Sequence, residues 1–73
     1  MKLRHKAFVI FNDGYEVPWV DLPSFRKVRD YSLKWLNHSQ VHYVKIVTYR
    51  YHFSLTEGQR VKVVTGVRYL ERG

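Results

Sequence analysis

The sequence has 73 residues, no cysteine, and thirteen Lys and Arg against six Asp and Glu, which gives a formal net charge of +7. This length allows one domain, residues 1–73, and a domain so small buries only about 60% of the surface that its unfolded chain exposes. The lack of cysteine excludes disulfides and thiolate metal sites, and a small cysteine-free chain fits the cytoplasm. An aromatic share of 16% compensates for the small core.

Residues 3–20 are predicted to form a β-hairpin. An apolar run, residues 7–11, indicates an interior strand, and it is too short for a signal-peptide core or a membrane span. Asn12-Asp13-Gly14 follows, and these residue types tolerate the positive φ angles of tight hairpin turns. The next segment, residues 15–20, alternates apolar and polar side chains but contains Pro18, which cannot donate to a strand ladder. We therefore expect this second strand at a sheet edge.

A helix is predicted to start at residues 21–24, where either Asp21 or Ser24 can cap free N–H groups, and to end at residues 37–39. One broad side of this helix is apolar, although Arg29 and Ser32 interrupt it. The apolar side consists of Leu22, Phe25, Val28, Leu33, Trp35 and Leu36.

Residues 41–53 are predicted to form one long strand, because they contain many β-branched and aromatic side chains and no Gly or Pro. Thirteen residues span about 40 Å, which is long for a small domain, so we expect a bend or bulge. The apolar positions change phase after Ile46, and this change indicates a bulge at residues 45–47. The alternative is that both faces of the strand are partly covered.

A loop is predicted at residues 54–59, with Gly58 as its positive-φ residue. The closing strand follows at residues 60–71, and Gly66 within it indicates a bulge or a close backbone approach. The element order ββαββ predicts an α+β fold in which one helix crosses one face of a four-stranded, mostly antiparallel sheet. Strand order 2-1-3-4 is favoured. A β-grasp order, with the first and last strands paired in parallel, is the alternative.

Catalytic and metal chemistry have little support in the sequence. His38 and His42 are four residues apart, but the predicted helix ends between them and no third ligand is recognisable. No Gly-rich phosphate loop or nucleophile elbow is present, and most carboxylates have a local role in a turn, cap or helix pair. We therefore expect a non-enzymatic protein without a cofactor or bound metal.

Basic residues interleaved with aromatic residues form the most informative pattern. Sheets that bind single-stranded nucleic acid use rings to stack on bases and cations to contact phosphates. The helix should leave one sheet face open, and we expect Arg60, Lys62 and Arg68 there, joined by His42, Arg50 and His52 or by the tyrosines, depending on the bulge. The predicted site for DNA or RNA consists of Arg4, Lys6, Tyr49, Arg50, Tyr51, His52, Arg60, Lys62 and Arg68.

Two other interpretations compete with this site. Tyr49, Tyr51 and Phe53 would pack beneath Trp35 as ordinary core while the basic residues line a solvated sheet face. Alternatively, the protein is a small adaptor or inhibitor, of the accessory type that mobile elements or phages encode. It would dock onto another protein through the edge strand at residues 15–20 or the end of the last strand, or form a homodimer through an exposed edge. No membrane partner is expected.

Overall fold

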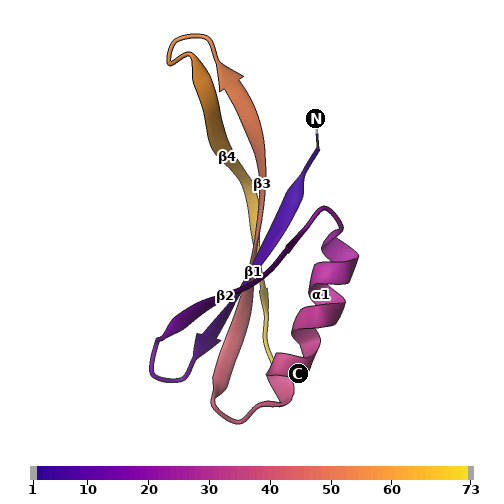
Figure 1. Ribbon diagram of the computed structural model, residues 1–73. Coiled ribbons are helices and arrows are strands. Elements are labelled where there is room, and N and C mark those ends of the chain that lie inside the picture. The colour runs from indigo at the N-terminus through magenta and orange to yellow at the C-terminus, as the bar shows by residue number, and fades with distance from the viewer. Residues whose placement is uncertain (1, 73) are drawn as a thin grey trace.

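The computed structural model describes residues 2–72, and it has the predicted α+β architecture (Figure 1). The four strands form one sheet in the order β2-β1-β3-β4, and each pair of neighbours is antiparallel. This order confirms the favoured arrangement and excludes the β-grasp alternative. The elements are β1 (Arg4–Phe11), β2 (Glu16–Leu22), α1 (Phe25–Leu33), the 3-10 turn η1 (Lys34–Asn37), β3 (Val41–Ser54) and β4 (Gln59–Leu70).

The β1–β2 hairpin closes through Asn12-Asp13-Gly14 as predicted. Gly14 has a φ of +89°, and the Asp13 carboxylate accepts a hydrogen bond of 3.0 Å from the backbone N–H of Tyr15. β2 lies at the edge of the sheet, as the missing N–H of Pro18 requires. It runs two residues further than predicted, to Leu22, because Asp21 pairs across the sheet with Lys6 of β1 and does not cap the helix.

Ser24 is the N-cap of α1, and its hydroxyl accepts a hydrogen bond from the backbone N–H of Lys27. The α-helix ends at Leu33, earlier than predicted, and η1 continues the helical path to Asn37 in a tighter winding. The prediction of an inward-facing Leu33 is wrong, since that side chain is exposed, whereas Ser32 is fully buried. Ser32 lies four residues after Val28, which puts both on the face that meets the sheet.

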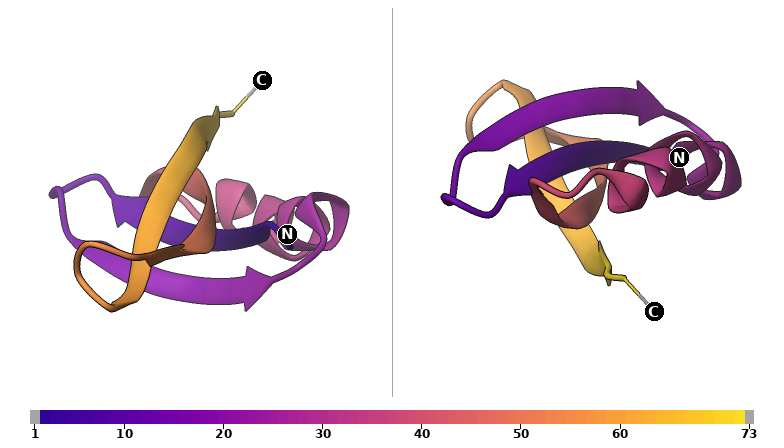
Figure 2. Two further views of the ribbon diagram at one scale, coloured as in Figure 1. Left: turned by 90° about the horizontal axis from the view of Figure 1, so that it is seen from above. Right: turned by 90° about the horizontal axis from the view of Figure 1, so that it is seen from below.

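Both ends of the helical segment pack on one face of the sheet (Figure 2). The buried centre consists of Ala7 from β1, Val28 from α1, and Val44 and Ile46 from β3. At the end of the helical segment, Trp35 and Trp19 meet edge to face with ring centroids 5.2 Å apart. Side chains that close the core around this centre are Val20, Leu22, Phe25, Trp35, Leu36 and Leu70.

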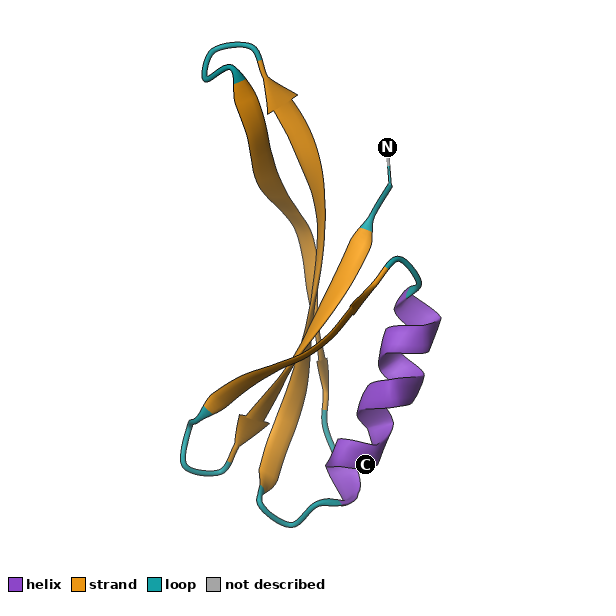
Figure 3. Cartoon of the chain, viewed as in Figure 1, coloured by secondary structure: helices purple, strands orange, loops and turns teal. Residues whose placement is uncertain are grey.

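The outer parts of β3 and β4 project beyond the rest of the sheet. Pairing between β1 and β3 ends at Arg4 and Tyr49, whereas β3 and β4 stay paired to Ser54 and Gln59. Residues 50–63 therefore form a two-stranded ribbon, here called the arm, which extends away from α1 (Figure 3). The arm contributes to the elongated shape of the molecule, which measures 46 × 25 × 16 Å. Gly58, with a φ of +67°, lies in the turn at its tip.

The predicted bulge at residues 45–47 is wrong, because the irregularities fall elsewhere. Thr48 pairs with Gly66 and Tyr49 pairs with Val64, so β4 carries one extra residue, Thr65, at the base of the arm. A second irregularity lies at the start of β3, where Ile10 pairs with Tyr43 but Phe11 pairs with Val41. The extra residue in β4 reverses which of its side chains point to each face, so Lys62 and Val67 share a face.

Candidate nucleic-acid interface

The sheet face opposite α1 is here called the open face. Ala7, Val44 and Ile46 point towards α1, so their neighbours along the strands point the other way. The strand pairing carries this alternation across β1, β3 and β4 and onto one side of the arm. Cations on the open face are Arg4, Lys6, Lys45, Arg60 and Lys62, and rings on it are Phe8, Tyr43, Tyr49, Tyr51, Phe53 and Tyr69.

Two lysines flank one ring near the middle of the open face. The Nζ atoms of Lys6 and Lys45 lie 5.3 and 5.1 Å from the ring centroid of Phe8. Lys45 also donates a hydrogen bond of 2.8 Å to the carboxylate of Glu16, and this bond raises the pKa of Lys45. Lys45 is therefore partly neutralised, whereas Lys6 remains available to an anion approaching from solvent.

Arg4, Asp21 and Tyr49 form a polar cluster where the arm leaves the sheet. The guanidinium of Arg4 binds the Asp21 carboxylate at 2.9 Å and its backbone carbonyl at 2.8 Å. The Tyr49 hydroxyl donates to the other carboxylate oxygen of Asp21, and this hydrogen bond raises the pKa of Tyr49. Tyr49 is only 4% exposed, with the ammonium of Lys62 lying 4.3 Å from its ring centroid. The cluster fixes the base of the arm and removes Tyr49 from contact with a base.

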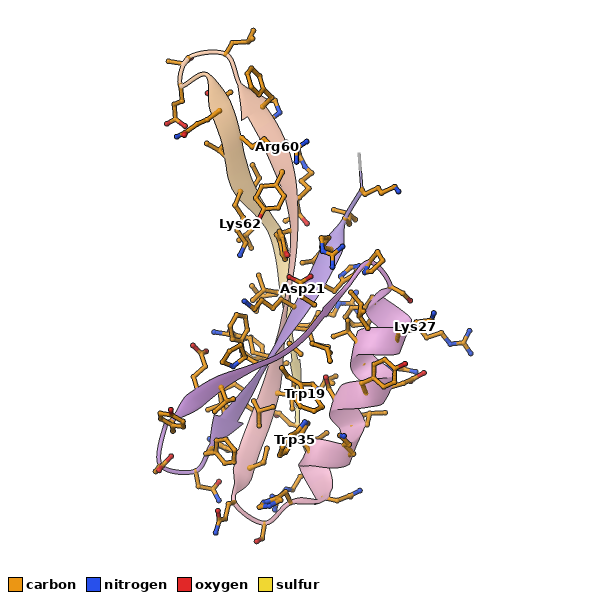
Figure 4. The ribbon with its side chains drawn as sticks, viewed as in Figure 1. Trp19, Asp21, Lys27, Trp35, Arg60 and Lys62 are labelled. Carbon is orange, nitrogen blue, oxygen red and sulfur yellow. The ribbon has the colours of Figure 1, made fainter. Side chains whose placement is uncertain are left out.

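A hollow of about 480 Å³ lies beside this cluster, between the arm and the start of the chain. Two of its rings are accessible, since Tyr51 is 47% and Phe53 is 54% exposed. Arg60 follows the arm loop and pairs with Phe53 across the two strands. Figure 4 shows Arg60 and Lys62 on the arm, away from the helix on which Lys27 lies. The lining residues are Lys2, Arg4, Pro23, Tyr51, Phe53 and Arg60.

The structure brings together only some of the residues predicted for the site. Arg4, Lys6, Tyr49, Tyr51, Arg60 and Lys62 share the open face. The expectation that Arg68 lies there is wrong, because Arg68 pairs with the core residue Ile46 and its guanidinium lies 5.2 Å from the ring centroid of Phe25 in α1. Arg50 and His52 pair with Val63 and Val61, which places them on the opposite side of the arm.

Tyr49, Tyr51 and Phe53 lie on the open face and not beneath Trp35, so that part of the alternative is wrong, although Tyr49 is buried as the alternative expected. Trp35 meets Trp19 and His38, on the helix side of the sheet. Sequence reasoning omitted Lys2, Phe53, Phe8 and Lys45 from the site. Phe8 and Lys45 are direct partners in the β1–β3 register, so the strand pairing is the signal that identifies them.

Within residues 2–72, no group of three or more His, Cys, Asp or Glu side chains could hold a metal ion. The helices in that same part of the chain are all too short or too polar to cross a membrane.

The fold is thus an α+β domain with one helix across a four-stranded antiparallel sheet and a projecting arm. Comparisons with protein-family models, with curated proteins and with solved structures found no match.

Proposed function

We propose that the protein is a non-enzymatic module that binds DNA or RNA through the open face. The supporting observation is the excess of cations on the open face, where Arg4, Lys6, Lys45, Arg60 and Lys62 outnumber the two carboxylates, Glu16 and Asp21. The only acidic residues in the four strands are Glu16 and Asp21, and each is already ion-paired, with Lys45 and Arg4 respectively. The other cations of the open face, Lys6, Arg60 and Lys62, face solvent beside accessible rings.

Phosphate contacts supply most of the affinity in this proposal. A surface that neutralises several phosphates releases condensed counterions, so its affinity falls steeply as salt concentration rises. The rings add contacts that do not depend on salt, because bases stack on them. The chain has no cysteine and needs no oxidising compartment to fold, so we place the module in the cytoplasm.

The test is a titration of labelled single-stranded and double-stranded oligonucleotides with the purified protein, at about 50 and about 200 mM salt. We expect binding at the lower salt concentration and a loss of at least about tenfold in affinity at the higher one. An absence of binding at the lower concentration contradicts the proposal.

A second candidate function is docking of a protein partner along β4. This strand is the outer edge of the sheet over its whole length, Gln59–Leu70, and it carries exposed Val67 and a 59% exposed Tyr69. Such an edge can accept a strand from a partner or from a second copy of the chain. One stoichiometric protein that is captured after nuclease treatment, or a dimer in analytical ultracentrifugation, supports this function over the first.

A further inference from the structure

We infer that the hollow at the base of the arm holds one unpaired nucleotide of a single strand, with its base against Tyr51 and Phe53 and its phosphate on Lys2 and Arg60. This inference rests on the proposed function and adds the site and the form of nucleic acid. The hollow is assembled from three segments: the residues at the start of the chain, the β2–α1 turn at Pro23, and the arm. Its volume of about 480 Å³ falls within the range of small-ligand sites.

The spacing of the two strand positions that carry the rings suits a base. Tyr51 and Phe53 are alternate residues of β3, so their side chains leave the same side of the arm about 6.7 Å apart along the strand. Stacked bases are about 3.4 Å apart, so a single base placed between two rings requires about twice that distance. Both rings are half-exposed in the absence of a ligand, so an incoming base reaches them without displacing core side chains.

The charges around the hollow suit one phosphate group. Among residues 2–72, Arg4 is ion-paired with Asp21, but no carboxylate lies within ion-pairing distance of Lys2 or Arg60. Arg60 and Lys2 both line the hollow and come from different segments, the arm and the start of the chain. A phosphate bound between them therefore gains two charge-assisted contacts without breaking an existing ion pair.

Whether the nucleic acid is double-stranded or single-stranded decides whether one of its nucleotides can enter the hollow. In a duplex, the bases are stacked on one another and a ring cannot reach their faces unless a base is extruded, at a cost of unstacking. In a single strand, the base faces are accessible. We therefore expect a duplex to bind the cations of the open face and a single strand to bind both the cations and the hollow.

The experiment compares wild-type protein with Phe53→Leu and Tyr51→Leu, which remove a ring but retain an apolar side chain. The probes are a labelled single strand of about ten thymidines and a labelled duplex, each followed by fluorescence anisotropy. Each substitution should weaken single-strand binding about tenfold and leave duplex binding within about twofold. Lys27→Gln is the control for general charge loss, because Lys27 is exposed on α1, away from Arg60 and the arm (Figure 4), and does not line the hollow.

Chemical-shift mapping of the wild-type protein with the same thymidine strand gives a second measurement that needs no variant. The largest shifts should fall on Lys2, Arg4, Arg60 and the segment from Tyr51 to Phe53. Equal loss of single-strand and duplex binding in the ring variants, or shifts spread evenly over the open face, overturns the inference while nucleic-acid binding stands. Absence of binding to either probe removes the proposed function as well.

Discussion

β3 and β4 behave differently in two regions of the molecule. Under the helix, β3 has a strand on each side and a helical layer above it, and its Val44 and Ile46 are fully buried. In the arm, the same strand has one neighbour and no covering layer, and its rings at Tyr51 and Phe53 are half-exposed. A two-stranded ribbon alone is marginally stable. The covered region therefore holds the fold, whereas the arm depends on its base and leaves its side chains exposed.

The largest expected effect is a difference in the free energy of unfolding between a substitution in the covered region and one in the arm. Ile46→Ala removes a fully buried side chain and should lower the free energy of unfolding by about 3 kcal/mol. Leu55→Ala, at the tip of the arm where Leu55 is 91% exposed, should change it by less than about 0.5 kcal/mol. Urea denaturation of both variants measures the difference. Similar losses from the two substitutions would show that the arm is part of the stabilising core.

The polar cluster at the base of the arm should affect both stability and binding. Asp21→Asn removes the charge that binds Arg4 and Tyr49 and should lower the free energy of unfolding by about 1 to 2 kcal/mol. The same change frees Arg4 and removes a negative charge beside the hollow, so oligonucleotide affinity should rise. Asp30→Asn breaks only a surface pair with Arg29 and should cost at most about 0.5 kcal/mol. A fall in affinity with Asp21→Asn would contradict the assigned role of this cluster.

Ser32 offers a way to strengthen the covered region without touching the arm. Its hydroxyl is buried under α1 and has no hydrogen-bond partner among the described residues. Ser32→Ala removes this unsatisfied group and introduces a better helix former, so it should raise the free energy of unfolding by about 1 kcal/mol. Ser39→Ala is the control, since Ser39 is exposed. A destabilised Ser32→Ala variant would mean that the hydroxyl makes a contact of its own.

His5 gives the covered region a smaller, pH-dependent contribution. Its ring is buried against Phe25 and lies 2.8 Å from the Thr48 hydroxyl, and burial lowers its pKa although Asp21 acts in the opposite direction. The unfolded chain therefore binds a proton more readily, so the stability is complete above the unfolded pKa of about 6.5 and declines as the pH falls below it.

His5→Gln should flatten this decline in thermal unfolding measured between about pH 7 and pH 5. His52→Gln, a change at an exposed position of the arm, should leave the decline unchanged. An undiminished decline in the His5→Gln variant would assign the pH dependence to another group.

The sequence predicted the order of elements because each element depends on local signals, whereas it left two strand orders open, with 2-1-3-4 favoured. Gly14 and Gly58 have the positive φ angles that their turns require, and Pro18 lies in an edge strand. β3 itself alternates without an extra residue from Tyr43 to Ser54, and its apolar side chains change face because only Val44 and Ile46 lie under the helix. The extra residue, Thr65, belongs to β4 and lies beside Gly66, where a bulge was one of the two expectations.

The candidate site could be predicted only in part, because it also depends on pairing between strands and on contacts between distant segments. Alternation within each strand correctly groups Arg60 with Lys62, but the bulge between them and Arg68 moves Arg68 to the helix side. The hollow brings together Lys2, Pro23 and Phe53, which are far apart in the sequence. Their proximity depends on where the arm leaves the sheet beside the start of β1, which no local pattern contains.

The most direct test of the account is the salt dependence of single-strand binding in two double variants with the same net charge. Arg60→Gln with Lys62→Gln removes two cations from the arm, whereas Arg26→Gln with Lys27→Gln removes two exposed cations from α1. If the arm contacts two phosphates, the slope of log affinity against log salt should become shallower by about 1.4 in the arm variant and stay at the wild-type value in the helix variant. An equal change in both variants, or no change in the arm variant, would contradict the account.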